Sequence, residues 1–329
     1  MAALAAVSVA MVALTAFGLW YAIVFPRQPF RGPLPPLDDA AQTLSVRLTD
    51  HLHAIAASPH NLAHEPALEA AARAIEDTLR SIGYRPRAQI YEVQGRPVRN
   101  IEITVGPSES DRNPPLPILI LGAHYDSAGE SPGANDNGSG VAAVIEIARA
   151  LRDFTPSRHR LQLVFWVNEE APWGKTPAMG SWQHAQRLSQ AREPVAGVIA
   201  LETLGYFSNA PGSQKFPWPF GHIYSDRGNF VAFVGLPGSR TFLRRSLAGF
   251  RRNAAFPSIG GVAPGFLEGI DLSDHWSYAQ FGYPALMVTD TAPFRNPFYH
   301  SEADLPDTVD TQSLARITLG LIGMLKDLA

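Results

Sequence analysis

The chain has 329 residues, of which 46% are apolar and only 17% are charged, and its formal net charge is −3. This composition predicts one large globular domain with a sizeable core and argues against a disordered chain or a repeat array. Acidic and basic residues are mixed along the chain, so no binding of nucleic acid is predicted. The lack of cysteine excludes disulfides, thiolate ligands and a cysteine nucleophile, and any metal must therefore bind to nitrogen and oxygen.

The first segment carries no formal charge from Ala2 to Phe25, which is long enough for a helix to cross a hydrocarbon core of about 30 Å. A cleaved signal peptide is the alternative, but no basic segment precedes the apolar run. We therefore predict a transmembrane anchor over residues 1–25, a Pro-rich linker over residues 26–38 and a globular domain over residues 39–329. Arg27 and Arg31 would hold their side in the cytoplasm by the positive-inside rule, so charge does not settle the orientation.

The globular domain begins with two predicted helices, because apolar residues recur at helical spacing over residues 39–55 and 65–82. Gly83 suits the C-cap of the second helix. Alternating apolar residues then predict an antiparallel pair of strands over residues 87–93 and 100–105.

Buried strands and helices alternate through the remainder of the chain. Predicted strands cover residues 118–121, 161–167, 195–201, 230–234 and 284–289, and predicted helices cover residues 138–154, 181–192, 240–253 and 311–328. This alternation predicts an α/β fold, a three-layer α/β/α sandwich around a mixed, mostly parallel central sheet.

Residue types that bind metals follow several predicted strands. His124, Glu169, Glu170 and Glu202 stand at the carboxyl ends of strands, and Asp136 lies in a glycine-rich loop. Open α/β sheets place their ligand crevices at these strand ends. Each residue alone is common in a solvated loop, but imidazole nitrogen and carboxylate oxygen together are suitable ligands for zinc. The sequence therefore predicts a metal site.

Five motifs, GAHYDS, GANDNGSG, NEE, LETLGY and NPFYHSEADLPDTVD, follow one another in an order that resembles the M28 family of zinc peptidases. The resemblance covers the chain from about residue 44 to its C-terminus and does not include the anchor or the linker. It implies a zinc-dependent exopeptidase that hydrolyses peptide substrates, in the first place an aminopeptidase. It also favours the exported side of a membrane for the catalytic domain.

The resemblance implies two zinc ions per chain that share the carboxylate of Asp136. His124 and Glu202 would bind one ion, and Glu170 and His300 would bind the other. Each ion would then have three protein ligands and an open position for water, as catalytic zinc requires.

Two further residues, Glu169 and Asp126, are expected to act in the site without binding zinc. By the same resemblance, Glu169 would be the general base that takes a proton from the attacking water and passes it to the leaving amine. Asp126 stands two residues after His124, and we expect its carboxylate to accept the second imidazole N–H and so orient the ring. The resemblance also implies a cis peptide between Asp136 and Asn137.

One departure from the family concerns Glu202, which stands where many soluble aminopeptidases of the family carry aspartate. Glutamate has the same charge as aspartate, but its longer side chain places the carboxylate differently. This difference leaves open whether one or two zinc ions are bound. A glutaminyl-cyclase-like acyl transferase, a carboxypeptidase and a catalytically silent binding module on the same fold are the alternatives. The intact set of candidate ligands argues against the silent module.

Three features outside the motifs predict a role near the site less specifically. The aromatic insertion over residues 207–220, with Phe216, Trp218 and Phe220, is expected either to line an apolar side-chain pocket or to pack as a covering loop. Arg295 is expected to form an internal salt bridge or to meet the substrate. Residues 273–275 read Ser-Asp-His, but groups adjacent in sequence do not easily converge as a triad. We expect Asp274 and His275 to hold a loop near the cleft, with contact to substrate as the alternative.

Overall fold

The computed structural model describes residues 2–106, 115–217 and 220–329. In these residues eight strands form one mixed sheet in the order β1-β2-β4-β3-β5-β8-β6-β7. The strands are β1(Arg87–Val93), β2(Arg96–Val105), β3(Ile118–His124), β4(Arg160–Trp166), β5(Val195–Glu202), β6(Val231–Gly235), β7(Ser258–Val262) and β8(Ala285–Thr289). The central strands β4, β3, β5 and β8 run parallel to one another, whereas β1, β2 and β6 each pair antiparallel with a neighbour.

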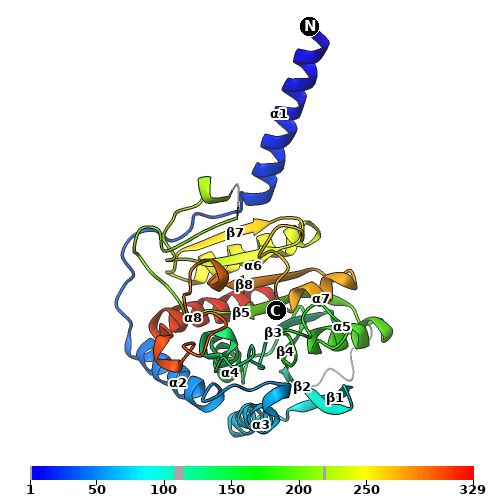
Figure 1. The fold of residues 1–329 in the computed structure, drawn as a ribbon, viewed down its shortest axis with the longest axis vertical. Helices are drawn as coiled ribbons and strands as arrows, with labels where there is room; N and C mark the ends of the chain where they lie inside the picture. Colours follow the sequence, from blue (N-terminus) through cyan, green and yellow to red (C-terminus); the bar gives the residue numbers. More distant parts are fainter. Residues whose placement is uncertain (1, 107–114, 218–219) are drawn as a thin grey trace.

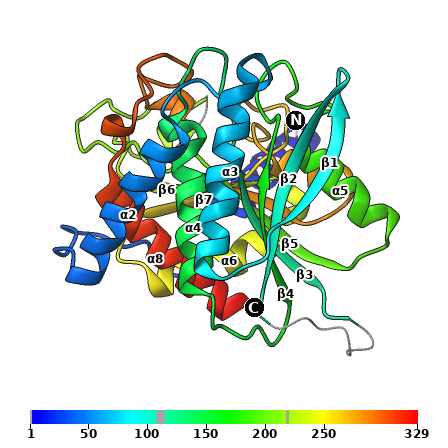
Figure 2. The same ribbon diagram turned by 90° about the horizontal axis from the view of Figure 1, so that it is seen from below.

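The helices are α1(Ala2–Ile23), α2(Asp39–Ile55), α3(Glu65–Ile82), α4(Gly140–Ala150), α5(Gly180–Gln190), α6(Arg240–Asn253), α7(His275–Gln280) and α8(Thr311–Leu328). Those after α1 cover both faces of the sheet. Figure 1 shows α5 and α7 together on one side of the sheet, with α2, α4 and α8 on the other. Figure 2 shows α2, α4 and α3 side by side on the latter face. The fold is the predicted three-layer α/β/α arrangement.

The two helical layers follow from the alternation of side chains along the buried strands. In β3, Leu119 and Leu121 belong to the large apolar cluster under α2, α3, α4, α6 and α8. Ile118 and Ile120 belong to a smaller cluster with Tyr278 of α7. Because successive strand residues point to opposite faces, a strand that is apolar throughout must be covered on both sides.

The first helix, α1, projects away from the rest of the molecule, and the N-terminus lies at its far end (Figure 1). Its last turn is attached to α6, where Arg240 donates hydrogen bonds to the carbonyl oxygens of Tyr21 (2.6 Å) and Val24 (3.1 Å). The same guanidinium lies 4.1 Å from the centre of the Tyr21 ring. Among the helices in the described part of the chain, none combines the length and hydropathy needed to cross a membrane.

Most predicted elements agree with the structure, and the differences have local causes. The strand predicted over residues 100–105 begins at Arg96, because Gln94 and Gly95 adopt positive φ angles and turn the chain tightly enough for Val93 to pair with Arg96. The edge strand β7 and the short helix α7 had no predicted counterpart. The sequence of β7, SIGGV, contains two glycines and weakens the strand pattern.

Candidate metal centre

Three neighbouring parallel strands bring most of the candidate residues to one edge of the sheet. His124 is the last residue of β3 and Glu202 is the last residue of β5, and these strands are paired. Glu169 and Glu170 lie in the loop after β4, whose last residue, Trp166, is aligned with His124. The carboxyl ends of parallel strands thus bring together side chains that are far apart in the sequence.

Asp136 is held by the helical turn η2(Ala134–Ser139), which begins the connection to α4. Helical geometry is interrupted at Asp136 (φ −112°, ψ 89°) and at Asn137 (φ −128°, ψ 36°). The predicted cis peptide between these two residues is present. The carboxylate of Asp304 accepts hydrogen bonds from the backbone N–H groups of Asn135 (2.9 Å) and Asp136 (3.0 Å), and it fixes the turn that presents Asp136.

The two oxygens of Asp136 face two different groups of side chains. Oδ1 lies 3.5 Å from Nε2 of His124, and Glu202 Oε2 lies 3.4 Å from the same nitrogen. Oδ2 lies 3.0 Å from Nε2 of His300, and Glu170 Oε1 lies 3.2 Å from that nitrogen. One carboxylate therefore stands between two sets of an imidazole and an acid.

The donor atoms of this cluster suit a cation. His124 Nε2, both Asp136 oxygens and Glu170 Oε1 are buried and have no hydrogen-bond partner among the described residues. Ligand atoms of His124, Asp136 and Glu170 lie within 4.8 Å of one another. Buried polar atoms that are close together but not aligned as hydrogen bonds are expected where a metal ion completes the site.

The electrostatics of the cluster also favour positive charge. Burial and the charge of Asp136 raise the pKa of Glu170 to about 8. The pKa of Glu202 is likewise raised to about 8, mainly by burial. Burial opposes a charged imidazole, but contacts with Asp136 and Glu170 raise the pKa of His300 to about 10. Buried acids that repel one another are stabilised by a cation, whether an imidazolium or a metal ion.

Glu169 lies next to the cluster but is not one of the two acids that face Asp136 and an imidazole. Its Oε2 is 4.0 Å from Nε2 of His124, and 16% of its side chain is exposed. Burial raises its pKa well above the usual value. A carboxylate with a raised pKa at the edge of a metal cluster is a stronger proton acceptor than a solvated glutamate.

Asp126 orients the site in a different way from the one predicted. The ring nitrogen Nδ1 of His124 is 3.1 Å from the backbone carbonyl oxygen of Asp126, whereas the carboxylate is 3.6 Å away, beyond a good hydrogen bond. The carboxylate instead accepts the backbone N–H groups of Glu169 (3.1 Å) and Glu170 (3.2 Å). Asp126 therefore links the His124 strand to the loop that carries the two glutamates.

Several residues support the site in ways that were not predicted from the sequence, although Tyr299 and Asn137 lie within the quoted motifs. Ser273 Oγ donates to Glu202 Oε2 at 2.8 Å, and the ring of Tyr299 stacks on that of His300 with 3.8 Å between the centres. The carboxamide of Asn137 accepts the N–H of Thr203 and donates to the carbonyl of Leu201, which fixes the end of β5. Within the Ser-Asp-His segment, the hydroxyl of Ser273 is the group that forms a hydrogen bond with a candidate ligand, Glu202.

The neighbouring His275 holds its loop as predicted, because its Nε2 lies 2.8 Å from the carbonyl oxygen of Ile270. Backbone strain is also concentrated near the site. Asn168, Thr203 and His300 have left-handed φ angles of 62°, 48° and 54°. Such conformations are uncommon for residues other than glycine, and they indicate that the surrounding contacts determine the position of the adjacent side chains.

Arg295 does not match the predicted internal salt bridge. Its guanidinium is buried and donates to Gln214 Oε1 (2.7 Å) and to the carbonyl oxygens of Phe230 (2.9 Å) and Gly228 (3.2 Å). The ring of Phe230 lies 4.4 Å from its carbon Cζ. Arg295 thus attaches the aromatic insertion to the domain. Trp218, also predicted to lie in that insertion, is outside the described residues.

A mixed α/β sheet with facing acids and imidazoles at its parallel strand ends defines a metallopeptidase of the zinc exopeptidase type. Residues 104–324 match the profile of peptidase family M28. The chain belongs to this family, as the five motifs predicted, and family membership implies zinc as its metal.

Sequence relatives agree with this assignment. The Escherichia coli (strain K12) protein YfbL is 36% identical over 307 residues, which are 91% of this chain and 92% of that protein. A probable lipoprotein aminopeptidase, LpqL, of Mycobacterium tuberculosis (strain ATCC 25618 / H37Rv) is 30% identical over 211 residues. That match includes 60% of this chain but only 40% of LpqL.

Solved structures share the fold. The LapA aminopeptidase of Legionella pneumophila superposes with a TM-score of 0.66 at 17% identity, over 91% of this chain and 77% of that chain. A glutaminyl cyclase of Bacteroides thetaiotaomicron superposes with a TM-score of 0.64 at 15% identity, over 89% and 99% of the two chains. At such identities the likeness concerns the fold alone.

Proposed function

We propose that this protein is an aminopeptidase that removes residues from the free N-terminus of peptides with two zinc ions per chain. The observation that carries the proposal is the position of Asp136, whose two oxygens face separate imidazole and acid sets. His124 and Glu202 would hold one ion, and Glu170 and His300 would hold the other. The aminopeptidase relatives support the choice of reaction.

Zinc at these positions would supply a Lewis acid and lower the pKa of a coordinated water. In the proposed mechanism, Glu169 accepts the proton of the attacking water and returns it to the amine that leaves. Asp126 keeps Glu169 and Glu170 in place through their backbone N–H groups. Ser273 keeps Glu202 oriented toward His124. The reaction requires no covalent intermediate with the enzyme.

The reaction can be tested with matched peptides that differ only at their ends. An aminopeptidase should release the first residue of a peptide with a free amine, and it should not act on the same peptide after N-acetylation. Cleavage at the C-terminal bond would indicate a carboxypeptidase. Cyclisation of an N-terminal glutamine without release of an amino acid would indicate the glutaminyl-cyclase-like reaction, and either result would contradict the proposal.

We further propose that the first helix holds the enzyme at the exported side of a membrane. The proposal rests on the uncharged sequence from Ala2 to Phe25 and on the exposure of Leu14, Phe17 and Trp20 along α1. The full chain should sediment with membranes in the producing cell, and a chain that starts at Asp39 should not. Recovery of the full chain in the soluble fraction would contradict this proposal.

A further inference from the structure

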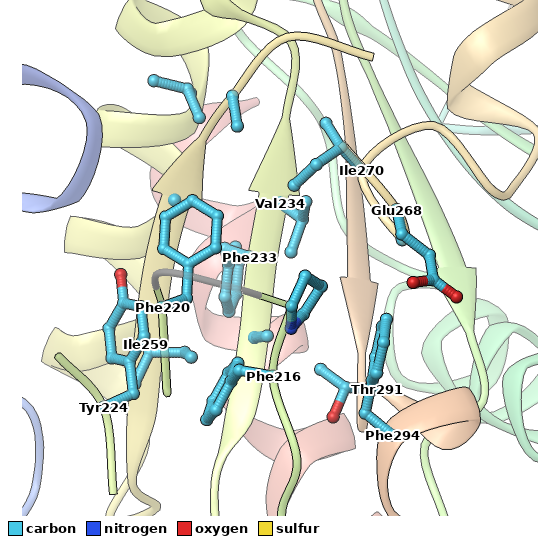
Figure 3. Close-up of a pocket in the computed structure, with 16 residues that line it drawn as sticks. Phe216, Phe220, Tyr224, Phe233, Val234, Ile259, Glu268, Ile270, Thr291 and Phe294 are labelled. Atoms are coloured by element: carbon cyan, nitrogen blue, oxygen red, sulfur yellow. The ribbon is translucent and has the colours of Figure 1, made fainter. Parts of the chain in front are cut away.

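Two cavities adjoin one another on the side of the metal centre where Glu202 lies. The nearer cavity is lined by Glu202, Leu272, Met287 and Tyr299. The farther cavity is a chamber of about 80 Å³ over strands β6 and β7, shown in Figure 3. They share four wall residues, which are Val234, Gly269, Thr291 and Phe294. The chamber is therefore the neighbour of the cavity that Glu202 lines, with a wall between them.

The walls of the chamber are almost entirely hydrocarbon. Phe216, Phe220, Phe233 and Ile259 present aromatic and aliphatic surface around it (Figure 3). The hydroxyl of Tyr224, which also lines the chamber, donates to the carbonyl oxygen of Gly260 at 3.1 Å. Two further polar side chains line the chamber: Thr291, whose hydroxyl donates to Gln214, and Glu268, which is exposed to solvent. Because the remaining wall is apolar, the chamber favours an apolar occupant over water.

Phe294 separates the two cavities. Its ring lies against the backbone of Gly269, where a Cβ atom would come within 2.7 Å of ring carbon Cε2. Gly269 also has a φ of +85°, which side chains rarely allow. The glycine thus lets the ring lie flat on the loop, and rotation of this half-buried ring would join the nearer cavity to the chamber.

We propose that the chamber receives the far end of a long apolar side chain on the first residue of the substrate. This inference rests on the proposed function, because the side chain of that residue must start beside Glu202. The enzyme would then prefer N-terminal residues with long unbranched or extended aromatic side chains. The alternative apolar occupant is the hydrocarbon chain of an acyl group attached to the terminal amine of a peptide.

The preference can be measured with the full chain on 4-nitroanilides of norvaline, norleucine, 2-aminooctanoic acid and 2-aminodecanoic acid. Burial of each added methylene should raise kcat/KM by about fourfold until the chamber is full. The variant Gly261→Leu should remove the gain beyond norleucine and leave norvaline within about twofold. A Cβ atom at Gly261 meets only the Tyr224 hydroxyl, at 3.9 Å, so the backbone can accept the change.

Two further variants make the test specific. Gly238→Leu is the matched control, because nothing lies within 4 Å of a Cβ atom there, and it should keep the full gain. Ile259→Phe narrows the same chamber from its wall, and it replaces Gly261→Leu if that variant does not fold. A decline in kcat/KM beyond norleucine in the native chain, or equal losses on all four substrates in the variant, would overturn the proposal.

Binding measurements separate this inference from the proposed function. If no aminoacyl anilide is cleaved, the proposed function fails, but calorimetry with free 2-aminodecanoic acid and norvaline still examines the chamber. The long amino acid should bind at least tenfold more tightly than norvaline, and Gly261→Leu should abolish the difference. If an N-decanoyl dipeptide binds more tightly than 2-aminodecanoyl-alanine and loses this advantage in Gly261→Leu, the occupant is an acyl chain and the proposal is wrong.

Discussion

Asp136 is the residue on which the proposed chemistry depends, because its two oxygens serve separate groups of side chains. The resemblance of the motifs to the M28 family predicted which acids and imidazoles would meet. They did not predict Ser273 or Asp304, whose roles depend on loops that reach the site from elsewhere in the chain. A serine or an aspartate in a loop has too many possible partners for sequence alone to select one.

Replacement of Glu169 by glutamine should separate metal binding from catalysis. The variant keeps the size of the side chain but cannot accept a proton, so kcat should fall by about 10²- to 10⁴-fold. The zinc content, measured by mass spectrometry, should remain that of the native protein. Glu130→Gln, at an exposed acid that pairs with His64, is the control. Native turnover in Glu169→Gln would show that another group is the base.

Replacement of Ser273 by alanine should weaken zinc binding without removing a ligand. Its hydroxyl is buried and donates to Glu202 at 2.8 Å, so its loss frees that carboxylate to rotate. We expect affinity for the zinc ion that His124 and Glu202 would hold to fall by about tenfold, as measured by competition with a chelator. At saturating zinc, kcat should stay close to native. Unchanged affinity would mean that Glu202 needs no such support.

Individual elements were predictable where the local pattern was strong. The helices over residues 39–55, 65–82, 240–253 and 311–328 have the predicted bounds, because apolar periodicity and terminal residues agree there. Gly83 caps its helix with a φ of +103°. The role of the insertion after β5 was not predictable, because aromatic residues in a loop are equally typical of a ligand pocket and of a loop that covers the sheet. The contacts of Arg295, together with the hydrogen bond from the Lys215 N–H to the carbonyl of Phe294, show how the insertion is attached.

Replacement of Arg295 by alanine should loosen the insertion that forms a wall of the chamber. It leaves the carbonyl oxygens of Gly228 and Phe230 without this donor, and we expect a loss of about 2 to 4 kcal/mol in the free energy of unfolding. Limited proteolysis should cut residues 207–230 faster than in the native chain. Arg245→Ala, at an exposed arginine of α6, is the control. A raised KM with native stability would instead indicate contact with substrate.

Glu102 of β2, which forms an ion pair with Arg187 and contacts the buried ring of His184 in α5, predicts a loss of stability in acid. Burial alone would raise the pKa of Glu102, but His184 and Arg187 lower it from 4.5 to about 2. The folded state therefore binds this proton less readily than the unfolded state, and the resulting stability is complete above pH 4.5. It is lost as pH falls from 4.5 toward 2, by roughly 3 kcal/mol.

Urea denaturation between pH 7 and pH 3 measures this effect. Glu102→Gln should lower stability at pH 7 and should show a smaller further loss toward pH 3 than the native chain. Glu92→Gln, at an exposed acid on the neighbouring strand β1, should retain the native pH dependence. An equal pH dependence in all three proteins would show that Glu102 is not the responsible group.

At the scale of the whole molecule, the parallel strands β4, β3 and β5 are what make one site from distant residues. The sequence predicted the layers, because apolar strands alternate with amphipathic helices. It did not predict the strand order, in which β8 lies between β5 and β6. That order places the loops after β7 and β8 next to Glu202, and so it determines which side chains line the cavities beside the metal centre.

Zinc titration of the metal-free full chain tests the two-ion centre most directly. Bound zinc and peptidase activity should be measured on the same samples with a substrate that has a free N-terminus. We predict that binding saturates at two ions per chain, that full activity requires both, and that Asp136→Asn lowers affinity for each. Saturation of both binding and activity at one ion per chain would contradict a centre shared through Asp136.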